Sequence, residues 1–155
     1  MVTSDKSKRD ASVENKITPL SASEKSRPVP PGLRVLAVDD DPAILRLIET
    51  TLIAAGHQVM AAGDGKAALA LAFKMDAQLV ITDWVMPVMD GLSLCRALRE
   101  NPQGKKMYVL MLSSLKGEGN LIQALEAGVD AYAVKPFTPK GLNALVLAAQ
   151  RALLT

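Results

Sequence analysis

The chain has 155 residues, of which 49% are hydrophobic and 22% charged, so it holds enough apolar material for one well-buried core. Its net charge of +2 and its five aromatic residues (one Trp, two Tyr and two Phe) argue against a nucleic-acid partner bound through charge or base stacking. The single cysteine, Cys95, excludes an intrachain disulfide and a multi-cysteine zinc site. The sequence has no signal-peptide core and no apolar run of the roughly 18 residues that a membrane helix needs. We therefore expect a cytoplasmic protein without a membrane partner.

The composition changes near Leu33. Residues 1–31 are rich in serine and proline, and their apolar residues are scattered. The run Arg27-Pro28-Val29-Pro30-Pro31-Gly32 can continue neither a helix nor a central strand. We therefore expect a disordered N-terminal tail over 1–31, either a docking arm or a solvated extension, and a single domain over 32–155.

From Leu33 onward, short apolar runs alternate with amphipathic stretches. In chain order they predict a strand at Leu33–Val38, a helix at Pro42–Ala55, a strand at Gln58–Ala62, a helix at Asp64–Lys74, a strand at Leu79–Thr82, a helix at Leu92–Arg99, a strand at Met107–Leu112, a helix at about 119–127, a strand at Ala131–Val134 and a helix at Pro139–Leu153. Because the strands are apolar along almost their whole length, we expect an α/β fold with a five-stranded parallel sheet and helices on both faces.

Chemically useful side chains follow four of the five predicted strands. The first strand ends in Asp39-Asp40-Asp41 and the third in Asp83, while the fourth ends in Ser113-Ser114 and the fifth in Lys135. In open parallel sheets, sites form beyond the carboxyl ends of the strands. These groups are therefore expected to converge at one edge of the sheet.

The carboxylates of Asp39, Asp40 and Asp83 would repel one another in such a pocket. Two like charges about 4 Å apart repel by about 4 kcal/mol at an effective dielectric constant near 20, and a divalent cation removes this repulsion. Oxygen ligands with room for water suit Mg²⁺ or Mn²⁺ better than zinc. We expect Asp41 to cap the following helix instead of binding metal, because Asp-Pro is a favourable helix start.

Lys135 and Ser113 would add an ammonium group and a hydroxyl beside that metal. Together with a divalent cation, such donors suit the oxygens of a phosphoryl group. A carboxylate placed among them can act as a nucleophile. Taken singly, either residue could be an ordinary loop side chain, but their positions at adjacent strand ends favour a phosphoryl-transfer site.

Four sequence blocks resemble the receiver domain of two-component response regulators. The blocks are Val38-Asp39-Asp40-Asp41, Ile81 to Gly91 (ITDWVMPVMDG), Met111-Leu112-Ser113-Ser114 and Val134-Lys135-Pro136-Phe137. The resemblance covers about residues 33–153, and the stretch around Asp83 is most similar to single-domain chemotaxis regulators. It implies a doubly wound, flavodoxin-like sheet with strand order 2-1-3-4-5.

The resemblance also implies a role for each acidic residue. Asp83 looks like the phospho-acceptor. Asp40 would bind Mg²⁺ directly and Asp39 through water, with Asp83 and the backbone carbonyl of Val85 completing the protein ligands.

Further roles follow from the same resemblance. Ser113 and Lys135 would hold the phosphoryl oxygens, and the Lys135–Pro136 peptide bond would be cis. Tyr132 occupies the position of the family's switch aromatic, which would turn inward when Ser113 moves toward the phosphate. The alternative for Tyr132 is simple packing on the last helix.

The function that the resemblance implies is a stand-alone regulator that accepts a phosphoryl group from a histidine kinase or a histidine phosphotransfer protein. It would not be an enzyme in the usual sense, because it would catalyse only its own phosphorylation and dephosphorylation. It would then dock a protein target through the face built from residues 119–127, the fifth strand and the last helix, or pass phosphate on as a shuttle. Alternatives are a fragment of a larger response regulator or hybrid kinase, and a haloacid dehalogenase-type phosphatase using Asp39-Asp40-Asp41. We expect structural roles for His57 and Cys95.

Overall fold

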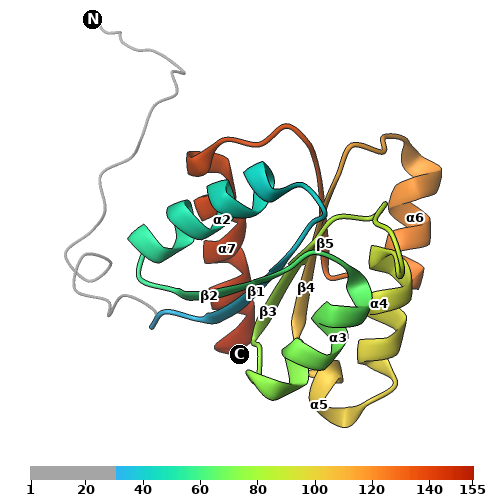
Figure 1. The fold of residues 1–155 in the computed structure, drawn as a ribbon, viewed down its shortest axis with the longest axis horizontal. Coiled ribbons are helices and arrows are strands. Elements are labelled where there is room, and N and C mark those ends of the chain that lie inside the picture. The colour runs from blue at the N-terminus through green and yellow to red at the C-terminus, as the bar shows by residue number, and fades with distance from the viewer. Residues whose placement is uncertain (1–30) are drawn as a thin grey trace, which may run out of the picture.

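The computed structural model describes residues 31–155, which form a five-stranded sheet between two layers of helices (Figure 1). The predicted tail over 1–31 lies outside the described residues except for Pro31. No helix in the described part of the chain is long and apolar enough to cross a membrane.

All five strands are parallel and stand in the order β2-β1-β3-β4-β5, as predicted. They are β1 (Arg34–Val38), β2 (Gln58–Ala62), β3 (Leu79–Thr82), β4 (Tyr108–Ser113) and β5 (Ala131–Val134). The order reverses at β1, so β1 and β3 lie side by side in the middle of the sheet. Their carboxyl ends are the place where an α/β sheet of this kind holds its site.

The helices match the predicted stretches, with one addition. They are α2 (Pro42–Ala54), α3 (Gly65–Lys74), α4 (Gly91–Arg99), α5 (Pro102–Lys105), α6 (Glu118–Glu126) and α7 (Pro139–Leu153). The short helix α5 is not apparent from periodicity, because a single turn repeats no pattern. Asn101 caps it and Pro102 begins it.

Asp side chains begin three of the longer helices. Asp41 accepts a hydrogen bond from the Ala43 N–H at the start of α2, as predicted, and Asp64 and Asp90 cap α3 and α4 in the same way. Gly117 precedes α6 and provides no side-chain cap. The start of α6 therefore lacks the local hydrogen bond that fixes its neighbours.

Two apolar clusters fill the two faces of the sheet. In β1, Val35 and Ala37 face one cluster and Leu36 and Val38 face the other, because successive side chains of a strand point to opposite faces. Helices α2 and α7 cover the first face, and α3, α4 and α6 cover the second (Figure 1). The buried Cys95 belongs to the second cluster, as expected for a small apolar residue.

Candidate phosphoryl-transfer site

The register of the central strands brings the predicted acidic residues together. Val38 of β1 pairs with Thr82 of β3, so Asp39 and Asp83 follow adjacent positions at the same edge. The Asp83 N–H also donates to the Val38 carbonyl at 2.9 Å. The main-chain ladder therefore fixes the spacing of the two carboxylates.

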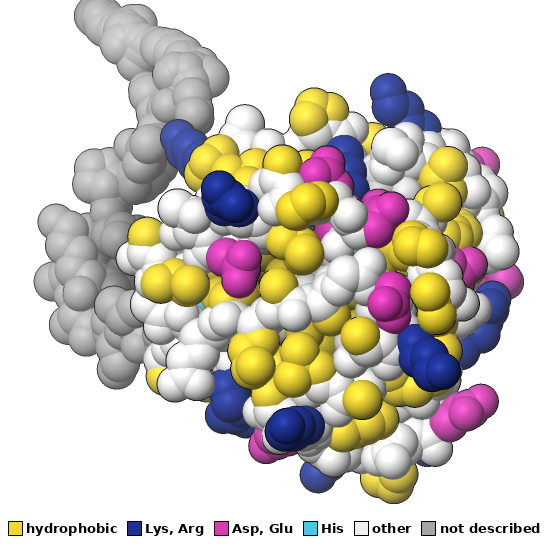
Figure 2. Space-filling model, viewed as in Figure 1, with side chains coloured by type: hydrophobic (Ala, Val, Ile, Leu, Met, Phe, Trp, Pro, Cys, Tyr) yellow, Lys and Arg dark blue, Asp and Glu magenta, His cyan; other side chains and the backbone are white. Residues whose placement is uncertain are grey.

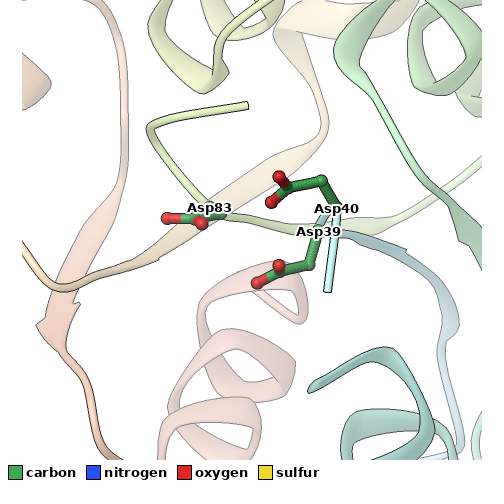
Figure 3. Close-up of side chains that lie close together, drawn as sticks. All are labelled: Asp39, Asp40 and Asp83. Atoms are coloured by element: carbon green, nitrogen blue, oxygen red, sulfur yellow. The ribbon is translucent and has the colours of Figure 1, made fainter. Parts of the chain in front are cut away.

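Asp39, Asp40 and Asp83 form one cluster, in which the three residues offer carboxylate oxygens within 4.8 Å of one another (Figure 3). Asp39 is 2% exposed, Asp83 is half-buried and Asp40 is exposed. Hard oxygen donors that are partly open to water are the ligands that Mg²⁺ prefers. The donor set that the sequence predicted for a metal therefore fits such an ion.

Lys135 lies among these acids although it is 96 residues from Asp39 in the chain. Its Nζ donates to Asp39 Oδ2 at 2.8 Å and is 3.2 Å from Asp83 Oδ2. Burial alone would lower the pKa of the Lys135 ammonium, but the hydrogen bond to Asp39 and the charges of both acids outweigh burial and raise that pKa. The ammonium is therefore a fixed positive charge at the site.

Asp83 lies in a partly dehydrated position at the end of β3. Burial raises the pKa of its carboxyl group, while the charge of Lys135 and the N–H of Trp84 oppose that rise. The Trp84 N–H donates to Asp83 Oδ1 at 2.7 Å. One carboxylate oxygen thus accepts a main-chain hydrogen bond and the other faces Lys135.

Ser113 ends β4, beside β3, and is buried. Its Oγ accepts a hydrogen bond from the Leu115 N–H at 3.1 Å, and its carbonyl accepts one from the Lys135 N–H at 2.8 Å. The latter bond ties the end of β4 to the loop that carries Lys135. The Lys135–Pro136 peptide bond in this loop is cis, as predicted.

Val85 lies in the loop between β3 and α4, two residues after Asp83. Its side chain is 63% exposed. The suggestion that its carbonyl binds a metal stays a prediction.

Tyr132 lies on the face of β5 that is opposite to the last helix. It packs against the cluster covered by α3, α4 and α6, whereas the α7 residues belong to the other cluster. The alternative interpretation, packing on the last helix, is therefore wrong. The ring meets Trp84 edge to face, and the hydroxyl donates to the Leu115 carbonyl at 2.6 Å.

The sequence analysis did not predict the contacts among Trp84, Leu115 and Tyr132. The three residues are separated by 31 and 17 positions (115 − 84 and 132 − 115), and nothing in their spacing indicates that they meet. Only the pairing of β3, β4 and β5 brings them together.

Comparison with protein families identifies the domain. Residues 35–147 match the response regulator receiver domain model. Over 113 residues the chain is 37% identical to the protein named "Probable transcriptional regulator ycf27" of Porphyridium aerugineum, which covers 73% of this chain and 46% of that protein. The chain thus spans less than half the length of this relative.

Solved structures agree with that match, and the agreement includes the predicted likeness to chemotaxis regulators. The chemotaxis protein CheY4 of Vibrio cholerae superposes with a TM-score of 0.73 at 35% identity, covering 76% of this chain and 98% of that chain. The receiver domain of the sensor histidine kinase PA1611 of Pseudomonas aeruginosa PAO1, solved with magnesium in its active site cleft, gives 0.71 at 28% identity, covering 80% of this chain and 99% of that chain. The chain therefore belongs to the response regulator receiver domains of two-component systems.

Proposed function

We propose that the chain accepts a phosphoryl group on Asp83 from a phosphohistidine of a kinase or phosphotransfer protein. An Asp83 carboxylate oxygen forms a bond to phosphorus while the P–N bond to the donor histidine breaks, and the electron pair of that bond stays on the imidazole nitrogen. Apart from this reaction and the hydrolysis of its product, the chain would catalyse nothing.

Lys135 and Ser113 would stabilise the transferred group. The ammonium compensates the negative charge of the phosphoryl oxygens, and the Ser113 hydroxyl supplies a neutral hydrogen bond. A Mg²⁺ ion held by Asp39, Asp40, Asp83 and the Val85 carbonyl would supply further charge compensation. Mn²⁺ has the same preference for oxygen ligands and could substitute.

The position of Lys135 is the observation on which this proposal depends. Its ammonium bridges the most buried acid, Asp39, and the half-buried Asp83. A purely structural ion pair needs one acid, whereas this cluster contains three. The excess negative charge, open to water at Asp40, favours a site that takes up a cation and a phosphoryl group over a structural salt bridge.

Intact-mass spectrometry tests the acceptor. After incubation with acetyl phosphate and Mg²⁺, we expect the wild-type mass to rise by one phosphoryl group. The matched control, Asp83→Asn, keeps the shape of the side chain but removes the nucleophile, and its mass should not change. An adduct of equal yield on the control would refute Asp83 as the acceptor.

Trp84 provides a separate test of the metal site. It is the only tryptophan, and its main-chain N–H donates a hydrogen bond to the Asp83 carboxylate. Mg²⁺ titration should therefore change its fluorescence, and Asp40→Ala should abolish that change. An unaltered titration curve in Asp40→Ala would place the metal away from this cluster.

The output of the domain is proposed to be the binding of a protein target. Several exposed large hydrophobic residues lie on α6, β5 and α7, namely Leu121, Ile122, Leu125, Val134 and Leu147. Figure 2 shows hydrophobic side chains over much of the visible face, including the side of the molecule where α6 lies in Figure 1. This distribution supports a protein target that binds the face of α6, β5 and α7.

The ycf27 relative is more than twice as long as the matched region, whereas the match covers 98% of the CheY4 chain. The stand-alone regulator and the larger regulator therefore both stay proposals. We predicted that this chain binds no nucleic acid, and this stays a prediction. The family match makes the haloacid dehalogenase alternative unnecessary, and we do not propose it.

A further inference from the structure

Trp84 and Tyr132 form an aromatic pair beside the acceptor. Their ring centroids are 6.2 Å apart and their planes meet at 87°. In this edge-to-face geometry the positive edge of one ring meets the negative face of the other, which adds attraction beyond the burial of surface. The residue next to Asp83 thus contacts an aromatic side chain of the edge strand β5.

The Tyr132 side chain is held at its other end as well. Its hydroxyl donates to the Leu115 carbonyl at 2.6 Å, and the N–H of the same Leu115 donates to Ser113 Oγ at 3.1 Å. The ring therefore lies between Trp84, whose main-chain N–H is hydrogen-bonded to Asp83, and Leu115, whose main-chain N–H is hydrogen-bonded to Ser113. All of these contacts are made by groups of the chain itself.

The Trp84 backbone is fixed on both sides. Its N–H donates to Asp83 Oδ1, and its carbonyl accepts a hydrogen bond from the Gly91 N–H at 2.7 Å. A Cβ on Gly91 would lie 2.1 Å from the Asp83 carbonyl oxygen, so the loop closes tightly at this point. Trp84 is also buried in the apolar cluster covered by α3, α4 and α6, whereas Tyr132 is only partly buried against it. If the two rings separate, we therefore expect Tyr132 to be the one that moves.

We propose that Trp84 is a positioning residue that holds Tyr132 in its inward position, so that this position is substantially populated before phosphoryl transfer. The inference rests on the proposed function and deepens it, because it concerns how the same site is regulated. An edge-to-face pair changes an equilibrium constant by about two- to twelvefold. Phosphorylation then needs to shift only the remaining outward population of Tyr132 to the inward position.

Chemical nitration of tyrosine measures this equilibrium, because an outward ring reacts with tetranitromethane faster than an inward one. The chain has only two tyrosines, so Tyr108 serves as an internal reference in the same sample. The ratio of nitration rates, Tyr132 to Tyr108, is read from peptide masses in the full-length protein. We compare wild type, Trp84→Leu and Trp84→Phe, each before and after treatment with acetyl phosphate and Mg²⁺.

We expect Trp84→Leu to raise the rate ratio by about two- to twelvefold. Phosphorylation of that variant should bring the ratio back toward the wild-type value. The reason is that Ser113 would then move toward the phosphate, and this movement favours the inward position of Tyr132. Trp84→Phe keeps an aromatic ring in the same space and should restore most of the protection. It is also the variant that preserves the most packing.

Two results would overturn the inference while the proposed function stands. One is an unchanged ratio in Trp84→Leu although wild type accepts phosphate. The other is a raised ratio that phosphorylation does not reverse, since a Tyr132 exposed only by the missing indole would stay reactive in both forms. A wild type that takes up no phosphate would instead contradict the proposed function, and the inference with it.

Discussion

His57 is the only histidine of the chain, and it is buried beside Leu33, which lies near the start of the described residues. Its Nδ1 accepts a hydrogen bond from the Leu33 N–H at 2.9 Å. Because this nitrogen must be unprotonated to accept, the bond requires the neutral ring. Burial lowers the pKa of His57, which has the structural role that the sequence predicts for it.

The stability of the fold should therefore fall in mild acid. The unfolded imidazole takes up its proton near a pH of about 6.5, before the folded one does, so the His57 contribution is present above that pH and is lost as the pH falls below it. Urea denaturation at several pH values should show this loss for wild type. His57→Gln keeps an acceptor but cannot titrate, so a constant difference between the two proteins across the pH range would contradict the assignment.

At the scale of elements, the loop between β3 and α4 carries backbone strain next to the acceptor. The Met89 N–H donates to the Pro87 carbonyl at 2.8 Å, which closes a three-residue turn around Val88 at a φ of 72°. A β-branched residue is rarely found at positive φ. The Val88 side chain is 76% exposed, so burial does not compensate for the strain.

Val88→Gly should consequently stabilise the protein. Relief of the strained φ is worth about 1–3 kcal/mol, and the greater freedom of unfolded glycine costs about 0.5–1 kcal/mol, which leaves a gain of about 1 kcal/mol. Val85→Gly is the matched control, because Val85 is similarly exposed but does not have a positive φ. Chemical denaturation should separate the two variants, and equal effects would mean that Val88 is not strained.

The loops that follow β3 and β4 should also set the lifetime of phospho-Asp83. Val85 and Leu115 stand two residues after Asp83 and two after Ser113. The resemblance to receiver domains implies that side chains at these two positions flank the path of the hydrolytic water. Neither apolar side chain can orient a water molecule, so we expect a long-lived phosphoprotein.

A decay experiment after removal of the donor measures that lifetime. The variant Val85→Asn/Leu115→Glu should lose phosphate roughly an order of magnitude faster than wild type. The Leu115 carbonyl, which holds Tyr132, belongs to the backbone and is retained in this variant. Equal decay rates would show that these side chains do not control the water.

The elements differ in how far the sequence predicts them. Strands β2, β3 and β5 and the last helix have the predicted bounds, since buried apolar runs and amphipathic periods are local signals. The convergence of Asp39, Asp83 and Lys135 could also be predicted, because parallel strands end at one edge. Neither α5 nor the Trp84–Tyr132 pair was predictable: α5 is too short to repeat a period, and the pair depends on packing between distant segments.

At the scale of the whole molecule, the described chain begins at Pro31, which contacts the last helix. The Pro31 carbonyl accepts a hydrogen bond from Gln150 Nε2 at 2.9 Å, which links the start of the described chain to α7. A Cβ on Gly32 would lie 2.1 Å from the Gly56 carbonyl oxygen, so this segment passes very close to the turn before β2.

Removal of residues 1–30 should leave both the free energy of unfolding and phosphorylation by acetyl phosphate unchanged. Removal of residues 1–32 should cost about 1 kcal/mol, the net value of one hydrogen bond, while phosphorylation persists. Urea denaturation and intact-mass spectrometry of the two truncated chains would check this. A chain beginning at Pro31 that does not fold would show that the preceding residues are structural.

The position of Lys135 after an edge strand has a consequence for the biosynthesis of the protein. The acids of the site come from the ends of β1 and β3 in the middle of the sheet. Their cation follows β5, which, among the described strands, pairs only with β4. A nascent chain still on the ribosome would already carry Asp39, Asp40 and Asp83 before Lys135 has been translated. Such a chain would lack the ammonium that compensates the phosphoryl oxygens, so we expect efficient phosphorylation only after synthesis and folding have reached the last strand.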